Sequence, residues 1–337
     1  MLQELKISGM RGIREGHLTG LAPLTILVGP NGSGKSTVLD ALLIGSGVII
    51  GDAVGRSVNR RSMNAHSSRD FFSAQGNSAS IEVNGESFQR ICDLSWQDIL
   101  EPRVLERLER YGRRPPFRQI TCKANTATEK QISWTGFGED NRYVFDYDQT
   151  RIDSLPARLI DTTGHLPLDK IYSELVKNGK RREMKKILQG VIPWLEDMEL
   201  LTDENPEPSL YLFNKKEEAI PLALAGDGIV TFARLAFTLM TRQEKLLLVE
   251  EPEIHQHPAC IGHTAKLLLD AVREGTQIVA TTHSLELIDY LLIHAVKDDL
   301  KNMALIKCVL DDGVLFNSLL RGEDIRFQRD TIEEDLR

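Results

Sequence analysis

The stretch Gly29-Pro30-Asn31-Gly32-Ser33-Gly34-Lys35-Ser36-Thr37 decides the fold, because it fits the pattern G-x-x-x-x-G-K-[ST]. Glycines at these spacings allow backbone N–H groups to turn inward around a chain of phosphates. The lysine of such a loop reaches the β- and γ-phosphates, and the hydroxyl after it ligates magnesium, which are the roles expected of Lys35 and Ser36. A helix that starts at this point adds the positive end of its dipole.

The residues on both sides of this loop provide the context that a phosphate-binding loop requires. Leu24–Val28 is a nearly continuous apolar run, broken only by Thr25, which is typical of a buried central strand. From about residue 35 to residue 43 the apolar residues recur at helical spacing. An ordinary glycine-rich turn is the alternative, but the strand before the loop and the helix after it favour a site for nucleotide phosphates.

Two carboxylates follow a second apolar run farther along the chain. The run Leu246–Val249 leads directly into Glu250 and Glu251. Because α/β sheets place ligands at the carboxyl edge of their parallel strands, we expect Glu250 to hold magnesium, directly or through water. We expect Glu251 to orient and polarise an attacking water. A solvated acidic loop is the alternative for these two residues alone, but their place downstream of a phosphate loop favours a role at the site.

A histidine follows a third apolar run. His283 comes just after the expected strand 277–280, and a lone histidine in such a place is usually structural. Here it is third in the order of phosphate loop, acidic strand and histidine strand, which predicts that it contacts the γ-phosphate or the catalytic water. We therefore expect Lys35, Glu251 and His283 to form the catalytic set.

Composition and charge exclude several classes of protein. The chain has 337 residues, of which 41% are apolar and 27% charged, so it is neither a mini-protein nor a collagen nor a mainly disordered chain. Its net charge of −8 gives no global basic balance that would point to nucleic acid. The four cysteines lie far apart, which argues against a disulfide framework or a cysteine zinc site. The sequence begins without a secretory signal and contains no membrane span, so we expect a cytoplasmic protein without membrane contact.

The rest of the chain alternates between blocks of strands and blocks of helices. Residues 50–76 are polar, with scattered arginines, and we expect a mobile loop there. Short alternating stretches within 79–147 predict an antiparallel sheet with a helix near 98–111. Helices are expected over 167–201, and Asp-Gly within 311–313 predicts a terminal hairpin. The second α/β block between them is expected to contain helix 228–241, strand 246–249, helix 259–273, strand 277–280 and helix 285–292.

These three motifs, in this order, resemble the ABC-class ATPase heads of the SMC, RecF and OLD families. The tightest resemblance is to compact OLD-like AAA-family ATPases, whose acidic strand continues as E-E-P-E-x-H-x-H-P; residues 250–258 read EEPEIHQHP. Residues 7–13 and 24–31 also look like the opening of those heads. The resemblance implies an α/β P-loop NTPase fold, namely an ABC-type bilobed head with a central mostly parallel sheet, an antiparallel β segment and a helical subdomain. It implies an N-terminal lobe at 1–150, followed by a helical insert and C-terminal lobe at 151–337.

The same resemblance implies ATP and Mg²⁺ as cofactors and an ATP-dependent homodimer that sandwiches two nucleotides. Ser36 and Glu250 would be the metal ligands, and residues 29–37 would bind the phosphates. The signature motif, which caps the partner's γ-phosphate, matches Gly226-Asp227-Gly228, although no serine stands where L-S-G-G-Q has one. His257 and Pro258 would belong to the loop that meets the other protomer. The glutamine loop of the family is not clearly identifiable, with Gln75 as a weak candidate.

What the sequence lacks narrows its role. No long coiled coil lies between Ser36 and Leu246, which excludes a full SMC-type rod. The residues after His283 are too few for the Toprim nuclease domain of full-length OLD proteins, so we expect any nuclease on a separate chain. We expect an ATPase that serves DNA maintenance, DNA repair or phage defence with a separate nuclease or toxin subunit. The alternative is a nucleotide-gated binding module that holds a partner toxin or nuclease in check. A transport ATPase subunit is a third reading.

Two basic segments are candidates for contact with a DNA backbone. Between residues 103 and 123, seven basic residues stand against two acidic ones, with Tyr111 and Phe117 interleaved. Residues 180–186 form the second basic segment. A solvated helix face is the alternative for both.

A metal cluster is one further candidate site in the sequence. Its members would be Glu253, His255, His257 and His263, although the resemblance already gives His257 another role.

Contact between the 103–123 segment and DNA predicts that linear DNA stimulates ATP hydrolysis at low salt. The stimulation should decline as salt rises, because phosphate contacts release counterions. Replacing Arg113, Arg114 and Arg118 by alanine should weaken it further. The measurement is the hydrolysis rate with and without DNA at two salt concentrations, and a stimulation that survives the triple replacement would contradict a role for this segment.

Overall fold

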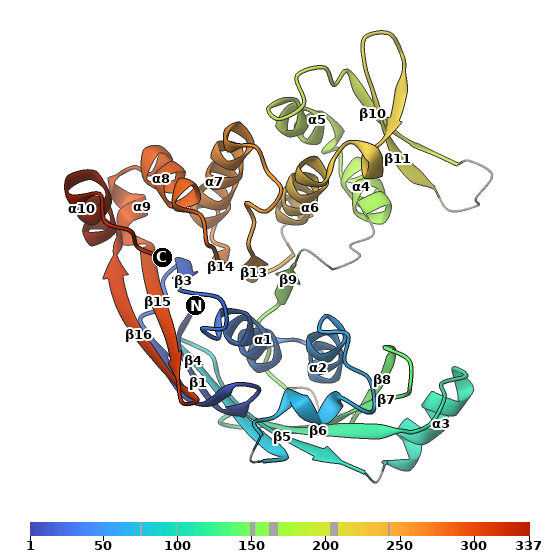
Figure 1. The fold of residues 1–337 in the computed structure, drawn as a ribbon. Helices are drawn as coiled ribbons and strands as arrows, with labels where there is room; N and C mark the ends of the chain where they lie inside the picture. Colours follow the sequence, from blue (N-terminus) through green and yellow to red (C-terminus); the bar gives the residue numbers. More distant parts are fainter. Residues whose placement is uncertain (75, 99, 149–151, 162–167, 203–207, 242) are drawn as a thin grey trace.

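The computed structural model describes residues 1–337 except 75, 99, 149–151, 162–167, 203–207 and 242 (Figure 1). In this part of the chain, thirteen strands from both ends of the sequence join into one sheet. These strands are β1 (Leu2–Met10), β2 (Ile13–Thr19), β3 (Leu24–Val28), β4 (Ser78–Gly85), β5 (Gln89–Gln97), β6 (Arg118–Asn125), β7 (Lys130–Phe137), β8 (Tyr143–Tyr147), β9 (Ala157–Ile160), β13 (Leu246–Glu250), β14 (Gln277–Thr281), β15 (Met303–Asp311) and β16 (Val314–Arg321). Across the sheet they lie in the order β8-β7-β6-β5-β4-β1-β2-β16-β15-β3-β14-β13-β9.

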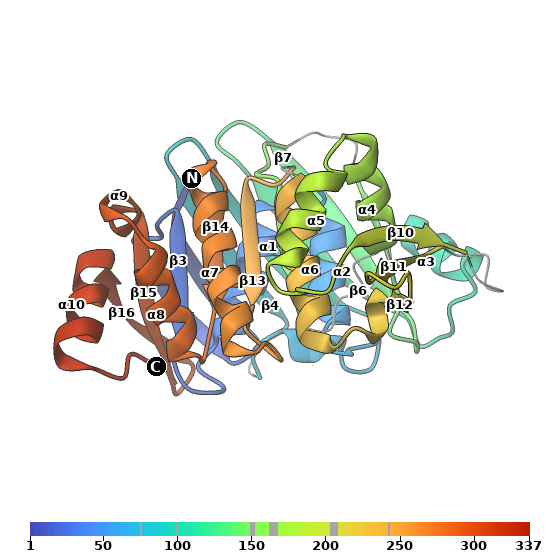
Figure 2. The ribbon, with the colours of Figure 1, turned by 90° about the horizontal axis from the view of Figure 1, so that it is seen from above.

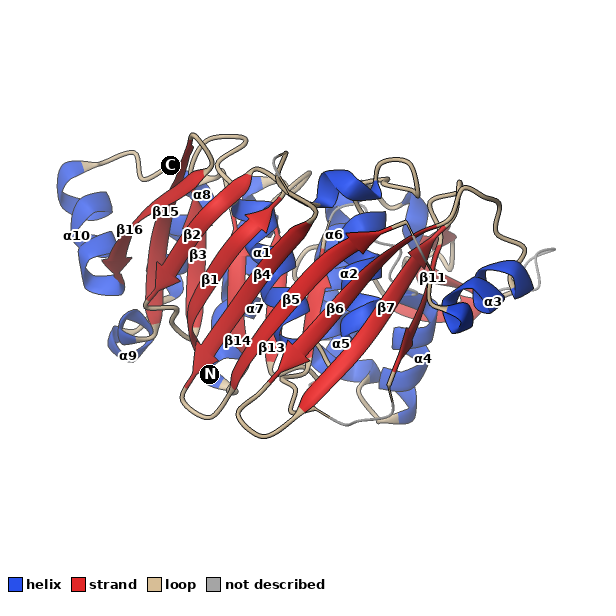
Figure 3. Ribbon diagram, turned by 90° about the horizontal axis from the view of Figure 1, so that it is seen from below, coloured by secondary structure: helices blue, strands red, loops and turns tan. Residues whose placement is uncertain are grey.

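The sheet has an antiparallel half and a parallel half. From β8 to β2 the neighbouring strands are antiparallel. Buried and exposed residues alternate along β1, as in a sheet with one face toward solvent, and Figure 3 shows these strands in front of the helices. From β15 to β9 the neighbours are parallel, and β3, β13 and β14 are buried almost throughout. Strand β16 joins the halves, since it is antiparallel to β15 and parallel to β2.

Helix α1 (Lys35–Ser46) lies between the two halves of the sheet (Figure 1). It contacts β1, β4 and β5 of the antiparallel half and β9, β13 and β14 of the parallel half. Every residue of α1 except Ser36 is buried, as expected of a helix that is covered on all sides. Gly45 allows a close approach to β4, because a Cβ at this position would lie 2.7 Å from the side chain of Val83. The loop before α1 is therefore fixed by packing on both faces of the helix.

A second layer of helices covers the other face of the parallel half (Figures 1 and 2). Its core with the sheet includes Leu247, Ile278 and Leu305. Within the described residues, none of the helices combines the length and the apolar composition needed to cross a membrane. The helices of this layer and of the C-terminal end are α6 (Asp227–Thr241), α7 (Pro258–Arg273), α8 (Leu285–His294), α9 (Lys297–Lys301) and α10 (Gly322–Ile332).

A smaller unit with its own core packs on α6 (Figure 2). Apolar residues of two helices, of a three-stranded antiparallel sheet and of α6 meet there, among them Met184, Leu212 and Phe237. The elements of this unit are α4 (Leu168–Lys177), α5 (Arg181–Gln189), β10 (Asp197–Leu201), β11 (Ser209–Phe213), β12 (Ala219–Pro221) and the 3₁₀ helix η2 (Leu222–Leu224).

The architecture confirms the expected α/β fold, in which parallel strands meet an antiparallel segment and a helical subdomain. The expected hairpin at 311–313 is also confirmed, because β15 and β16 pair through Asp312 and Gly313, both with positive φ. The expected lobe boundary at 150–151 lies outside the described residues and stays a prediction. Strands from both sides of this boundary share the one sheet.

The described residues of the range 50–76 do not form the expected mobile loop. They contain α2 (Ile50–Asn59) and the 3₁₀ helix η1 (Ser68–Phe71). Ile50, Val54 and Val58 recur at helical spacing and are buried, while the polar residues between them obscure this pattern in the sequence. The helix α3 (Pro102–Arg110) was expected near its place, whereas β2, β5, β9 to β12, α9 and α10 were not expected. Strand β10 occupies the end of the range 167–201, which was expected to be helical.

Gln277 joins the first residues of the chain to β14. Its Oε1 accepts a hydrogen bond of 2.8 Å from the N–H of Leu2. Its Nε2 donates to the carbonyl oxygens of Leu2 at 2.7 Å and Ala22 at 3.3 Å. The Gln277 side chain is buried. Water therefore has little access to these main-chain groups and would not replace the hydrogen bonds that Gln277 provides.

Replacing Gln277 by alanine should therefore lower the free energy of unfolding by about 2–4 kcal/mol, because buried main-chain groups lose their partners. Replacing the exposed Gln243 by alanine should cost less than about 0.5 kcal/mol. Urea denaturation of both variants measures the difference. Equal losses would show that the hydrogen bonds of Gln277 do not stabilise the joint between β1 and β14.

Candidate functional site

The loop 29–34 joins β3 to α1 at the carboxyl edge of the parallel strands. Gly29, Gly32 and Gly34 have φ angles of +138°, +80° and +90°, in the region that favours glycine. Gly29 also lies against β15, where a Cβ would come within 2.2 Å of the carbonyl oxygen of Cys308. The strand, loop and helix that the motif requires are thus all present, and side chains at these glycines would strain the loop.

Lys35 is almost fully buried beneath the loop. Its Nζ donates hydrogen bonds to the carbonyl oxygens of Gly29 at 2.8 Å and Pro30 at 3.0 Å, and lies 3.4 Å from the hydroxyl of Ser33. Burial lowers the pKa of Lys35, although the charges of Glu251 and Glu250 oppose this shift. The ammonium group is therefore held inside the curve of the loop.

A cavity of about 320 Å³ opens beside the loop, a volume within the range of about 300–1,000 Å³ that is typical of ligand sites. It brings together most of the residues that the sequence predicted for the phosphates and for catalysis. Gly29, Glu250 and the segment 226–228 are not part of its lining. The lining residues are Arg11, Gly12, Ile13, Asn31, Gly32, Ser33, Gly34, Lys35, Ser36, Thr37, Arg61, Glu251, His283 and Leu310.

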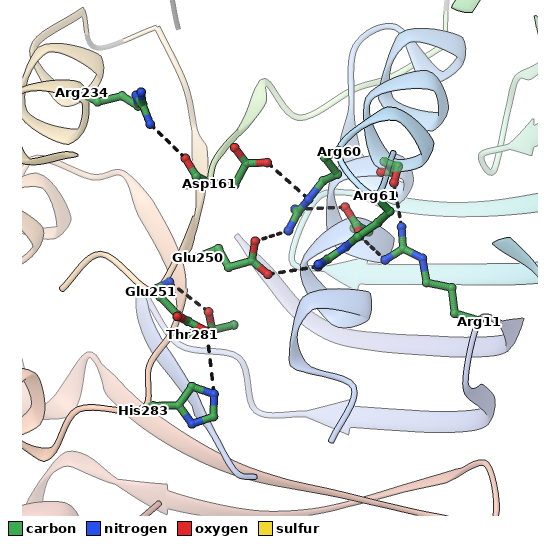
Figure 4. A network of polar contacts seen from close by, with 11 residues as sticks. Arg11, Arg60, Arg61, Asp161, Arg234, Glu250, Glu251, Thr281 and His283 are labelled. Atoms are coloured by element: carbon green, nitrogen blue, oxygen red, sulfur yellow. Dashed lines mark hydrogen bonds and ion pairs between the residues drawn. The ribbon is translucent and has the colours of Figure 1, made fainter. Parts of the chain in front are cut away.

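Glu250, the last residue of β13, lies beside two arginines, Arg60 and Arg61 (Figure 4). The Arg60 guanidinium forms an ion pair with one of its oxygens, and Arg61 donates to the other at 3.1 Å. Burial would raise the pKa of Glu250, but the charge of Arg60, a hydrogen bond with Ser36 and the charge of Arg61 outweigh it, and the pKa is lowered. The two residues predicted to ligate magnesium, Ser36 and Glu250, therefore lie close enough for Ser36 to influence this carboxylate.

Arg60 is the centre of a buried cluster of charges that connects four parts of the fold (Figure 4). Besides Glu250, it contacts Asp40 of α1 at 3.2 Å and Asp161, just after β9, at 3.3 Å. Arg11 also forms an ion pair with Asp40. The main-chain oxygen of Asp161 in turn accepts a hydrogen bond from Arg234 of α6. The cluster thus joins α1, the end of α2, the end of β13 and α6.

Glu251 and His283 face each other where β13 and β14 end (Figure 4). His283 Nε2 lies 3.8 Å from Glu251 Oε1. Glu251 has a φ of +45°, and its N–H donates to the carbonyl oxygen of Thr281 at 3.1 Å and to its hydroxyl at 3.2 Å. Burial and the charge of Lys35 lower the pKa of His283, so its imidazole is neutral at pH 7.

The segment 226–228 is at the start of α6, and Gly226 and Asp227 are exposed. Gly228 packs against the loop after β13, where a Cβ would lie 2.4 Å from the carbonyl oxygen of His255. His257 caps the next helix, because its Nδ1 accepts a hydrogen bond of 3.2 Å from the N–H of Ala259. This segment and the loop at 255–257 therefore lie together, outside the lining of the cavity.

Three arginines at the site, Arg11, Arg60 and Arg61, were missed by the sequence analysis. Arg60 and Arg61 were assigned to a mobile loop, and the buried spacing of α2 is the signal that would have placed them at a helix end. Arg11 lies in a segment that was noted only for its resemblance. Gln75, the candidate for the glutamine loop, lies outside the described residues.

The proposed metal cluster at 253–263 is wrong for the described part of the chain, where no three His, Cys, Asp or Glu side chains lie close enough to hold a metal ion.

In the 103–123 segment, several arginines have acidic partners nearby. Arg118 contacts Asp98 at 2.8 Å, Arg113 contacts Asp140 at 3.2 Å and Arg103 contacts Asp146 at 3.6 Å. Contact of this segment with DNA stays a prediction, and these carboxylates reduce the charge available for it.

Replacing Arg60 by alanine should lower the free energy of unfolding by about 3–5 kcal/mol, because it leaves buried carboxylates without their shared cation. Arg56 is the matched control, since it is an exposed arginine of α2 that pairs with Asp52 one turn away. Its replacement by alanine should cost less than about 1 kcal/mol. Urea denaturation of the two variants tests this difference, and a loss for Arg60→Ala no larger than for Arg56→Ala would contradict it.

The fold is similar to that of solved SMC heads. An SmcHead bound to the C-winged helix domain of ScpA has a TM-score of 0.55 and 15% identity, with 95% of this chain and 97% of that chain covered. An Smc head domain with an extended coiled coil, bound to the C-terminal domain of ScpA derived from Pyrococcus furiosus, has a TM-score of 0.51 and 13% identity, with 99% of both chains covered. At these identities the likeness is one of fold.

Sequence comparison gives a relative and a family. The uncharacterized protein MJECL11 of Methanocaldococcus jannaschii is 34% identical over 113 residues, which are 33% of this chain and 98% of that protein. The profile of a family described as "AAA domain, putative AbiEii toxin, Type IV TA system" matches residues 24–289, well over half of the chain. This match spans the phosphate loop, the acidic strand and the histidine strand, and the chain therefore belongs to this family of AAA-type P-loop ATPases.

Proposed function

We propose that this protein binds ATP with Mg²⁺ and hydrolyses it, as one half of an ATP-sandwich dimer. The single observation that carries the proposal is the cavity in which the phosphate loop, Glu251 and His283 meet. These residues come from three distant parts of the sequence, and the fold brings them to one edge of the parallel strands. Such an edge is where open α/β sheets bind their ligands.

The cavity suits a chain of phosphates. Its loop provides main-chain N–H groups and the start of α1, both of which favour anions. The Lys35 ammonium now bonds to carbonyl oxygens of the same loop, and these are bonds that phosphate oxygens can replace. Arg11 and Arg61 add positive charge to the wall of the cavity.

Ser36 and Glu250 suit magnesium, since a hydroxyl and a carboxylate are the oxygen ligands that this ion accepts. Ser36 follows the loop directly and contributes to the lowered pKa of Glu250, so the two groups lie near each other. When bound, magnesium would neutralise charge on the phosphates. In the structure as it stands, Arg60 and Arg61 neutralise Glu250, and they would share this carboxylate with the ion or release it.

Glu251 and His283 suit the activation of water. In the proposed reaction, water attacks the γ-phosphorus, the bond to the bridging oxygen breaks, and ADP and inorganic phosphate are formed. Glu251 carries a carboxylate at the cavity wall that accepts a proton from the water and orients it. His283 is neutral at pH 7, so its ring offers one N–H donor and one acceptor nitrogen beside this carboxylate.

The exposed position of Gly226 and Asp227 supports a dimer. Its main-chain N–H groups at the start of α6 form a site suited to an anion, but they are not part of the chain's own cavity. In the proposed dimer this segment contacts the γ-phosphate bound by the other protomer. The neighbouring Leu224 is 76% exposed and would be covered at the same interface.

For the biological setting, the family description favours the second of the three roles considered above. It names a putative toxin and a type IV toxin–antitoxin system, which fits a nucleotide-gated module that regulates a partner toxin or nuclease. DNA maintenance or phage defence with direct DNA contact has less support, because arginines of the 103–123 segment have carboxylate partners within the protein.

Replacing Glu251 by glutamine should leave ATP binding intact and slow hydrolysis by at least about a hundredfold, because the amide cannot accept the proton. ATP would then trap the dimer. Light scattering of the variant with and without ATP measures this, with Glu286→Ala as a control that removes an exposed carboxylate nearby. A Glu251→Gln variant that binds ATP and stays monomeric would contradict the sandwich.

The gated-module role predicts a protein partner whose binding depends on nucleotide. The trapped variant with ATP, used as bait against the product of a neighbouring toxin or nuclease gene, should retain this protein. The same bait without nucleotide should not retain it. A hydrolysis rate that DNA raises, together with no such partner, would contradict this role and favour DNA maintenance.

A further inference from the structure

Glu253 lies on the turn after β13, and its side chain reaches the end of β14. Its Oε1 accepts a hydrogen bond of 2.5 Å from the hydroxyl of Thr282 and one of 3.2 Å from the main-chain N–H of His283. Thr282 and His283 are the two residues that follow β14. One carboxylate oxygen therefore ties the acidic turn to the histidine segment.

Both ends of this connection are fixed by further hydrogen bonds. On the acidic side, the N–H of Gln256 donates to the carbonyl oxygen of Glu253 at 3.0 Å, and its side chain accepts from Thr264 of α7 at 2.7 Å. On the other side, the buried hydroxyl of Thr282 accepts from the N–H of Ser284 at 2.9 Å, and Ser284 caps α8. The connection thus runs from α7 to α8 through Glu253.

The second oxygen of this carboxylate has no such role. Oε2 is buried and has no hydrogen-bond partner among the described residues. A carboxylate with an unpartnered buried oxygen is costly to the folded state, and burial raises the pKa of Glu253. Oε2 therefore destabilises the folded state, whereas Oε1 connects two strand ends through its hydrogen bonds. A residue that lowers stability in this way is typical of a functional site.

We propose that Glu253 is a positioning residue of the nucleotide site, which holds the main chain at His283 and thereby sets the place of the imidazole beside Glu251. This inference rests on the proposed function, which gives both side chains a role in hydrolysis. Two connections hold the pair: Glu251 is bonded through its N–H to Thr281, and His283 is bonded through its N–H to Glu253. The 3.8 Å between His283 Nε2 and Glu251 Oε1 is the distance that they set.

Two variants of Glu253 separate positioning from a general structural role. Glu253→Gln keeps an oxygen acceptor at this place, whereas Glu253→Ala removes it. We expect both variants to be less stable than the wild type. Glutamine places an NH₂ group where Oε2 has no partner, and alanine leaves the Thr282 hydroxyl and the N–H of His283 without their acceptor. Only the alanine variant should release His283. Glu286→Ala, in the first turn of α8, is the matched control because its side chain is exposed.

The experiment compares the imidazole ¹H–¹⁵N spectrum of the full chain in each variant, with the His283 signals identified by their loss in His283→Gln. It also measures kcat and the Kd for ATP. Glu253→Ala should move the His283 signals and lower kcat by about tenfold to a hundredfold, as expected when a reacting group is misplaced. The Kd for ATP should change by less than about twofold. Glu253→Gln and Glu286→Ala should keep the His283 signals and kcat near those of the wild type.

Three results would overturn the inference: unmoved His283 signals in Glu253→Ala, an unchanged kcat despite moved signals, or a glutamine variant as impaired as the alanine variant. Failure of the proposed function is distinguishable from these. It would appear as a wild-type protein that hydrolyses ATP no faster than Lys35→Ala. In that case the imidazole spectra still decide whether Glu253 positions His283.

Discussion

Burial of α1 between the two halves of the sheet is the constraint on which the rest of this structure depends. The helix contacts strands of both halves, and all of its residues except Ser36 are buried. A helix packed on every side cannot shift without opening a core, so the loop before it has a fixed place. Because β3, β13 and β14 are parallel, their carboxyl ends meet at that loop. The residues at these ends therefore meet the phosphate loop as a consequence of topology.

The charges of the site are arranged around the same helix. Asp40 of α1 holds Arg11 and Arg60, and Arg60 connects it to Glu250 at the end of β13. Arg61 reaches the same carboxylate from the wall of the cavity. Without a bound ion, arginines therefore neutralise Glu250, the carboxylate proposed for magnesium. Arg234 extends the cluster to α6, the helix that begins with the segment 226–228. The cluster therefore runs from the wall of the cavity, through Arg61 and Glu250, to α6, where Arg234 donates to the main-chain oxygen of Asp161.

The parts of the site that the sequence predicts are those encoded within a few neighbouring residues. The phosphate loop, the pair Glu250 and Glu251, and His283 each follow an apolar strand, and local pattern is sufficient to find them. Arg60 could not be found in this way, because its role depends on contact with Glu250, 190 positions later. The same applies to Glu253, whose partners lie 29 and 30 positions away on another strand end. The fold class was predictable from the order of strands and helices, whereas the short strand β9 is recognisable only by its pairing with β13.

The measurement that tests the central claim most directly is the release of inorganic phosphate from Mg-ATP by the wild-type protein and by Lys35→Ala. If the phosphate loop, Glu251 and His283 form one hydrolytic site, the wild type turns over ATP, and the variant loses at least about a hundredfold in rate while its circular dichroism spectrum stays that of the wild type. A wild-type protein that releases no phosphate, or a Lys35→Ala variant that releases it at the wild-type rate, would contradict the account.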